Sequence, residues 1–155
     1  MGYVDRNLMR DEQVIHEAKM HWFIFVPGVV FLIAGAYLFF AASLGGNAGP
    51  ALGMISTMVA IISLMKALIA KLSTELAVTS KRVIAKVGFI GRTTAELNHS
   101  KVESFNVEQS IFGRIFGFGT VIVNGTGANK TTIPNIDSPL EFRRSAMQSI
   151  DDSQS

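Results

Sequence analysis

Residues 22–72 read WFIFVPGVVFLIAGAYLFFAASLGGNAGPALGMISTMVAIISLMKALIAKL. Residues 22–44 contain no charged side chain, and residues 51–65 form a second apolar run that continues through Lys66 to Leu72. The hydrocarbon core of a bilayer is roughly 30 Å thick and takes about 20 helical residues to cross. A short, helix-breaking segment, GGNAGP at residues 45–50, separates the runs. Because so short a turn allows only an antiparallel return, the stretch predicts a transmembrane helical hairpin.

The composition suits two membrane spans joined to a small soluble domain. Of 155 residues, 48% are apolar and 17% are charged. Residues 73–155 are long enough to bury a core of their own, and their nine Lys and Arg nearly balance their eight Asp and Glu. We therefore expect no nucleic-acid partner. The chain has no cysteine, which excludes disulfides, thiolate zinc sites and cysteine nucleophiles.

Residues 1–21 form a charged leader without the pattern of a cleavable signal peptide, so the first run is expected to stay in the mature protein. Two structures fit this leader. Apolar residues within 8–18 suit one face of a short helix with Asp11 as its cap. The alternation from Val14 to Trp22 suits a short strand instead. Sequence alone does not separate them.

Positive charges flank the two runs and predict the orientation of the hairpin. They precede the first run or lie at or after the end of the second, at Arg6, Arg10, Lys19, Lys66, Lys71, Lys81 and Arg82. The connecting turn has none, so the positive-inside rule places both termini in the cytoplasm. Trp22, at a run boundary, and Lys66 and Lys71, near the cytoplasmic end, are expected to be interfacial anchors.

Small residues form a line along the second run. They recur in alternating steps of four and three, at Gly49, Gly53, Ser56, Ala60, Ser63, Ala67 and Ala70. The first run offers a sparser line, at Gly28, Gly35 and Ala42. Such seams let helix backbones approach closely in lipid. Two interpretations remain: the lines pack on each other within the hairpin, or part of the seam contacts another protomer.

After residue 72 the pattern becomes strand-like. Short β-branched segments occupy residues 75–79, 82–87, 93–97, 102–108, 120–124 and 130–133, with a tight turn at residues 80–81. An amphipathic helix is expected over residues 138–150, followed by a disordered polar end at 151–155. The predicted fold class is α+β: residues 73–150 form a small antiparallel barrel or two-sheet sandwich capped by a helix.

Three segments of this region resemble bacterial pleckstrin-homology (PH-like) domains. They are LAVTSKRVIAKVGFIGRTT at residues 76–94, LNHSKVES at 97–104 and QSIFGRIFGFGT at 109–120. Members of this branch often carry one or two membrane helices before the domain, and EQVI at 12–15 and HW at 21–22 also resemble that architecture. The resemblance implies two near-orthogonal sheets closed by the C-terminal helix, in a multi-pass protein of the bacterial cytoplasmic (inner) membrane.

Two groups of residues are candidate contacts. Ile111, Phe112, Ile115, Phe116 and Phe118 surround Arg114 in a glycine-rich turn. These apolar groups either plug the core or form an exposed patch that meets the bilayer or another protomer. Lys81, Arg82, Lys86 and Arg92 lie on the first predicted strand pair and its exit. In eukaryotic PH domains a basic first loop holds phosphoinositide headgroups. Here the loop has only two residues, so we expect a solvated hairpin or loose contact with anionic lipid headgroups.

Groups for catalysis are sparse, and we expect no enzyme, no cofactor and no metal. His16 and His21 are five residues apart and do not share a helical face, and nucleophile-elbow and zinc motifs are missing from the sequence. The leading hypothesis is a membrane-anchored binding or scaffolding module that forms a homo-oligomer. The alternatives are a small oligomeric pore that uses Lys66, and an accessory subunit of a membrane enzyme or another membrane protein.

Overall fold

The computed structural model describes residues 3–42, 48–88, 93–127 and 129–154. They form two compact units: residues 22–72 are one, and residues 1–21 together with residues 73–155 are the other. The leader therefore folds with the C-terminal part of the chain, across the intervening hairpin. Residues 45–47 of the predicted turn, together with Arg92 and Ser155, lie outside the described residues.

The first unit is a hairpin of two apolar helices, as predicted. A 3-10 turn, η1 (Trp22–Phe25), leads into α2 (Val26–Ala42), and α3 (Ala48–Ser73) runs back. Spans of 19 and 25 residues are long and apolar enough to cross a membrane. Only 11% and 17% of the residues in their most apolar windows are buried, whereas the core helix of a soluble protein is mostly buried.

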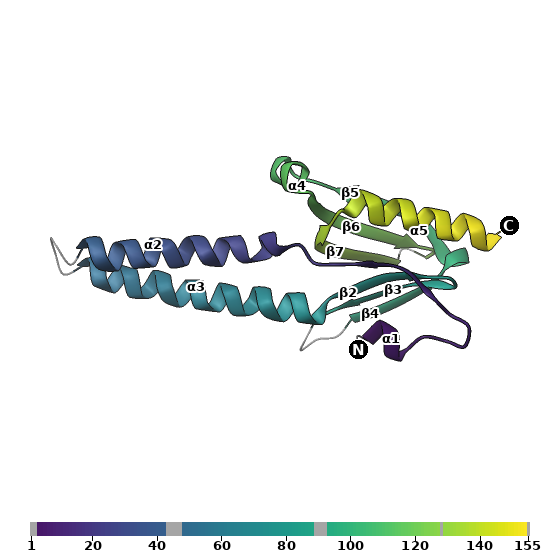
Figure 1. The fold of residues 1–155 in the computed structure, drawn as a ribbon, viewed down its shortest axis with the longest axis horizontal. Helices are drawn as coiled ribbons and strands as arrows, with labels where there is room; N and C mark the ends of the chain where they lie inside the picture. The colour runs from purple at the N-terminus through teal and green to yellow at the C-terminus, as the bar shows by residue number, and fades with distance from the viewer. Residues whose placement is uncertain (1–2, 43–47, 89–92, 128, 155) are drawn as a thin grey trace. The chain divides into compact units, whose positions relative to one another are not determined.

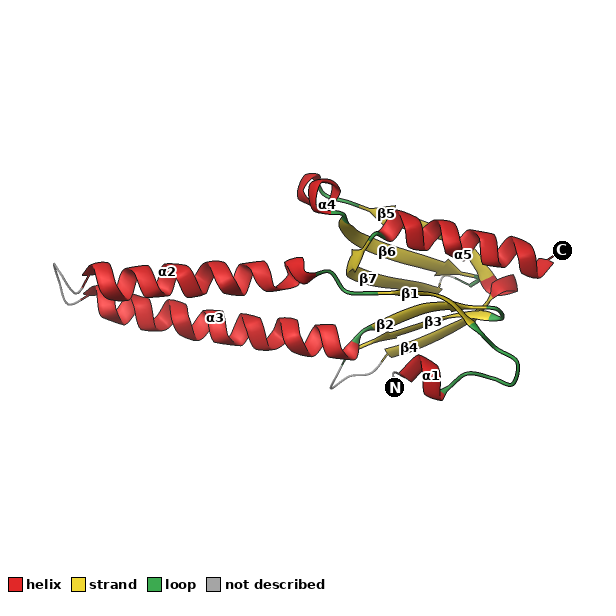
Figure 2. Cartoon of the chain, viewed as in Figure 1, coloured by secondary structure: helices red, strands yellow, loops and turns green. Residues whose placement is uncertain are grey.

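The second unit is a sandwich of two antiparallel sheets (Figure 1, Figure 2). Their orders are β1-β2-β3-β4 and β5-β6-β7. The strands are β1 (Val14–Ala18), β2 (Glu75–Thr79), β3 (Arg82–Val87), β4 (Thr93–Asn98), β5 (Val102–Glu108), β6 (Phe118–Gly125) and β7 (Asn129–Asp137). All six strands predicted after residue 72 are present, and Val78 pairs with Val83 around the two-residue turn. The described strands form two separate sheets, which favours the sandwich over a closed barrel.

The leader contributes a strand, so the helix alternative for residues 8–18 is wrong. β1 pairs with β2, with Ala18 opposite Leu76. Asp11 caps no helix here and instead has a positive φ of 61° in the turn before β1. Because β1 and β2 are neighbours in the sheet, the hairpin is an insertion in the connection between the first two strands. The opening strand pair is therefore β1 and β2, not β2 and β3 as the sequence suggested.

The core lies between the two sheets and α5 (Pro139–Gln154). Its buried residues are Ala18, Leu76, Val78, Val83, Ala85, Phe105, Val121, Val123, Ile133, Ile136, Phe142 and Ala146. The helix was predicted over residues 138–150 and continues to Gln154. The spacing of apolar residues predicts Leu140 and Met147 on the apolar face of this helix, but both are exposed.

A short helix that the sequence did not predict, α1 (Tyr3–Arg6), covers the other face of the first sheet. Val4 packs there against Ala77 and Ile84. Successive strand residues point to opposite faces, so these two side chains face away from the main core. The leader therefore packs on both sides of this sheet: β1 extends the sheet and faces the core, and α1 closes the outer surface.

Candidate functional site

The connection between β5 and β6 carries an exposed apolar surface. It is the short helix α4 (Ile111–Phe116). The exposed fractions are 78% for Ile111, 62% for Phe112, 69% for Ile115 and 45% for Phe116. We call these four residues the α4 surface; the structure places them outside the core rather than plugging it. Phe118, predicted as their neighbour, is buried in β6 and stacks on His21, with ring centroids 5.3 Å apart.

Local hydrogen bonds hold α4 at both ends. The Ser110 hydroxyl accepts a bond from the Gly113 N–H at 3.1 Å, a standard N-cap. Gly117 ends the helix in the left-handed conformation, with φ at 79°. The Gln109 side-chain amide donates to the Phe118 carbonyl at 2.9 Å. A Cβ on Gly113 would lie only 2.5 Å from that carbonyl oxygen. The glycine face of α4 is therefore packed against β6, which leaves the apolar side chains pointing outward.

Arg114 places a positive charge beside this surface. It is the charged residue of α4, and it is exposed. Together with Leu140 and Glu141, at the start of α5, it lines a shallow hollow. Apolar and basic groups thus occur together where α4 approaches α5.

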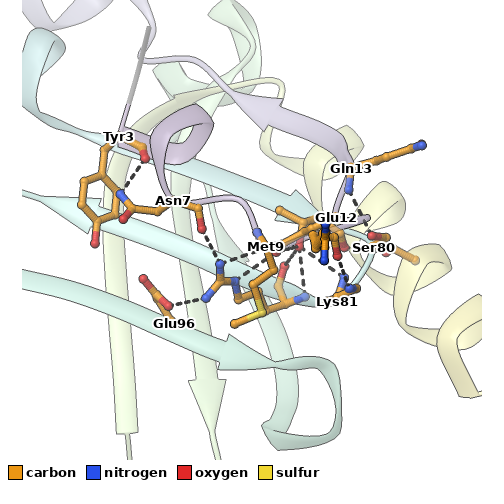
Figure 3. A network of polar contacts seen from close by, with 12 residues as sticks. Tyr3, Asn7, Met9, Glu12, Gln13, Ser80, Lys81 and Glu96 are labelled. Carbon is orange, nitrogen blue, oxygen red and sulfur yellow. Dashed lines mark hydrogen bonds and ion pairs between the residues drawn. The ribbon is translucent and has the colours of Figure 1, made fainter.

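Arg82 is buried, not on the surface. It belongs to a polar network whose members Asn7, Glu12 and Glu96 are labelled in Figure 3. Its Nε and Nη2 atoms bind the two Glu12 carboxylate oxygens, each at 3.0 Å. Its Nη1 donates to Glu96 at 2.6 Å and its Nη2 to the Asn7 carbonyl at 2.7 Å. The Thr79 hydroxyl donates to Glu12 at 2.7 Å. Arg82 was a candidate lipid-headgroup contact, but the structure buries its guanidinium and engages it in four hydrogen bonds within the protein, which leaves it inaccessible to a headgroup.

The network sets the ionisation of Glu12. Burial alone raises the pKa of this carboxyl group. The hydrogen bonds from Arg82, the Met9 N–H and Thr79, with the charge of Arg82, outweigh burial and leave the pKa below its ordinary value. Glu12 is therefore a buried carboxylate that ties the leader to the sheet.

The other predicted headgroup contacts differ from one another. Lys81 is exposed, and its Nζ donates to the Arg10 carbonyl at 2.7 Å. Lys86 is partly buried and pairs with Glu75 at 3.3 Å. Its Nζ also lies 5.0 Å from the centre of the Tyr3 ring. The contacts to Arg10 and Tyr3 hold the leader on the sheet.

In the hairpin, the small residues bring the two helices together. A Cβ on Gly53 would lie 2.7 Å from the Phe39 nitrogen and 2.9 Å from the Gly35 oxygen. A Cβ on Gly28 would meet the Leu64 side chain at 2.7 Å. The Ser56 hydroxyl donates to the Phe31 carbonyl at 2.9 Å.

The remaining seam positions of α3 agree with this packing. Ala60 and Ala67 are buried, and Ser63 is partly buried, whereas the side chain of Ala42 lies outside the described set. The seam therefore packs within the hairpin, while contact of these residues with another protomer stays a prediction.

The predicted interfacial anchors lie at the helix ends. Trp22 is 54% exposed, and Lys66 and Lys71 are exposed near the end of α3. The Lys71 ammonium lies 5.5 Å from the centre of the Phe25 ring, a cation–π distance. A long aliphatic stem with a terminal charge suits an interface.

The histidines lie apart from one another. His16 contacts Phe142 edge-on, and His21 is buried against Phe118. The Nδ1 atom of His99 lies 3.0 Å from the Ser153 hydroxyl. Within the described ranges, no three His, Asp or Glu side chains form a metal-binding group.

His99 gives the domain a sensitivity to acid. Its buried Nε2 atom has no hydrogen-bond partner among the described residues. Burial lowers the pKa of His99 below its ordinary 6.5, an effect that the carbonyls of Thr79 and Arg82 only partly offset. Between the lowered pKa of His99 in the folded chain and 6.5, the unfolded chain therefore binds more protons than the folded chain. As the pH is lowered through this range, the free energy of unfolding should decrease by up to about 1.4 kcal/mol per pH unit.

Urea unfolding at several pH values measures this slope. In a His99→Gln variant residue 99 cannot titrate, so the free energy of unfolding should decrease less steeply as the pH is lowered from neutral. An equally steep decline in the variant would contradict the assignment to His99.

A sequence model of a family described as "Bacterial PH domain" matches residues 23–148 of this chain. No curated protein and no solved structure matches it. The family match begins after β1, whereas the structure places β1 in the first sheet.

Proposed function

We propose that this chain, which belongs to the bacterial PH domain family, is a membrane-tethered binding module that catalyses no reaction of its own. The hairpin spans the inner membrane, both termini lie in the cytoplasm, and the sandwich presents a surface to a partner. Family membership supports the binding role, and the helices support the tether.

The observation that carries the tether is the outward apolar surface of α2 and α3. Tyr37, Phe40 and Met58 are 70%, 71% and 67% exposed. Such exposure is unfavourable in water, because each large apolar side chain that stays exposed loses the roughly 1.5–3 kcal/mol of free energy that its burial would contribute. In a bilayer the same side chains face lipid, while the helices satisfy their own backbone hydrogen bonds.

Self-association is the second part of the proposal. An apolar hollow beside the close approach of the two helices is lined by Phe39, Met54, Met58 and Ile62. A second copy that packs into this hollow would bury it. The mass of the protein in mild detergent tests this part, and a strictly monomeric mass would remove it.

Cysteine labelling tests the tether, because the natural chain has no cysteine. We expect an Asn47→Cys variant to react with an impermeant maleimide in intact spheroplasts, and a Gln148→Cys variant to react only after lysis. Gln148 is exposed on α5, so its protection must come from the membrane. Reaction of Gln148→Cys before lysis would overturn the orientation. Protection of both positions before lysis would overturn the crossing itself.

A further inference from the structure

The point where the chain leaves the sandwich for the first helix is fixed by contacts with β7. The His21 N–H donates to the Asn135 carbonyl at 2.7 Å. Met20 forms an isolated bridge with Ile136. Trp22 follows directly and starts η1. The last residues of the leader therefore lie along the C-terminal end of β7.

The second helix returns to the same end of the sandwich. β2 begins at Glu75, directly after α3. Leu76 in β2 lies opposite Ala18, the last residue of β1. Antiparallel neighbours run in opposite directions, so the end of β1 and the start of β2 lie together, about 4.8 Å apart. Both covalent connections to the hairpin thus leave from one end of the sandwich, which we call the hairpin end.

α4 is attached at the hairpin end. Phe118, the first residue of β6, stacks on His21 with ring centroids 5.3 Å apart. Gly117, which ends α4, accepts a hydrogen bond from the Ser138 N–H at 2.9 Å, just after β7 ends. In Figure 2, α4 projects beyond the ends of β5 and β6. Only Gly117 separates the α4 surface from the residue that contacts the end of the leader.

The α4 surface has no role in the core of the sandwich. Its four apolar residues are 45–78% exposed on a helix that is capped at both ends. Arg114 lies on the same helix, and Arg143 and Arg144 are exposed on the first turns of α5. Exposed apolar residues flanked by basic ones are typical of a segment that lies in the membrane interface. Anionic headgroups attract arginines that lie close to the membrane surface.

We propose that α4 is a second membrane contact of this protein. The α4 surface enters the boundary between headgroups and acyl chains of the cytoplasmic leaflet, and Arg114 lies among the headgroups. This inference rests on the proposed function, because only a domain tethered by a spanning hairpin has its hairpin end at the lipid surface. The contact holds the sandwich against the bilayer instead of leaving it to swing on its two connections.

Tryptophan fluorescence tests the contact in the full chain, whose only tryptophan is Trp22. The Trp22→Phe/Phe112→Trp variant carries its single tryptophan on the α4 surface. We place it in vesicles of phosphatidylethanolamine and phosphatidylglycerol that contain acyl-brominated lipid. The emission of this tryptophan should shift to shorter wavelength and be quenched. The matched control is Trp22→Phe/Met9→Trp. Met9 is 54% exposed and lines a hollow with Ser80 and His99, by the turn between β2 and β3.

Three further outcomes are decisive. A water-exposed, unquenched tryptophan at residue 112, with Trp22 of the natural chain still quenched, overturns the α4 contact and leaves the tether standing. Loss of quenching at both positions overturns the tether and the contact together. A blue-shifted emission at residue 112 that brominated lipid does not quench, and that returns to the red when the protein is diluted in excess lipid, shows a second copy on the α4 surface and overturns the lipid assignment.

Discussion

Replacement of Arg82 by methionine is expected to lower the free energy of unfolding of the sandwich by about 3–5 kcal/mol, the usual cost of breaking a buried ion pair. Arg82 is 6% exposed, and the Glu12 side chain that it binds is completely buried. Methionine fills a similar volume but leaves the Glu12 carboxylate without its two guanidinium bonds. It also releases the Asn7 carbonyl, so the leader should detach from the sheet more readily.

Urea unfolding of the full chain in detergent measures this loss, and hydrogen exchange of residues 3–18 locates it. Arg143→Met is the matched control, because Arg143 is exposed on α5. The double variant Glu12→Gln/Arg82→Met removes the buried Glu12 charge together with its arginine partner. The double variant should therefore be more stable than Arg82→Met alone. Equal stabilities of Arg82→Met and Arg143→Met would show that the network contributes nothing to folding.

Replacement of Gly53 by leucine is expected to separate α2 from α3. The first added carbon alone would lie 2.7 Å from the Phe39 nitrogen and 2.9 Å from the Gly35 oxygen, both backbone atoms. A backbone atom cannot rotate away as a side chain can, so the helices must move apart. Overpacking of this kind costs about 1–3 kcal/mol and occasionally more. Helices in lipid or detergent associate largely through the van der Waals packing that close approach allows, so little else would make up for its loss.

Unfolding of the helices by a rising fraction of sodium dodecyl sulfate in mild detergent, followed by circular dichroism, measures the effect. Ala51→Leu is the control, since it enlarges a side chain on the same helix at an exposed position. The Gly53→Leu hairpin should unfold at a lower fraction of the denaturing detergent. Superimposable unfolding curves for the two variants would mean that the seam does not hold the hairpin together.

The sequence predicted the elements whose pattern is local. The β-branched alternation of residues 82–87 and the uncharged run after Trp22 each determine their own structure within one short window. Both segments are found as predicted, β3 as a strand and α2 as a helix. For residues 111–116 the sequence left two interpretations, a plug of the core and an exposed patch. It could not decide between them, because a glycine-rich turn does not reveal which of its faces will pack against the rest of the domain.

The remainder depends on contacts between residues that are distant in sequence. Glu12 and Arg82 are 70 residues apart, and no spacing rule links a leader carboxylate to a basic residue beyond the hairpin. The sequence grouped Arg82 with Lys81, Lys86 and Arg92 as a candidate headgroup contact because all four lie on the first predicted strand pair and its exit. The same distance left the leader undecided between helix and strand, since the strand that pairs with β1 lies past residue 72.

The insertion of the hairpin between β1 and β2 has a consequence for the order of synthesis. A ribosome makes β1 first, yet the strand that pairs with it emerges only after the whole of residues 22–72. Until then β1 has no strand to pair with, and Glu12 lacks its arginine. The sandwich is therefore completed only after both apolar helices have been made. If the hairpin spans a membrane as proposed, its insertion shortens the distance over which β1 must search, because it returns the chain to the side of the membrane from which it started.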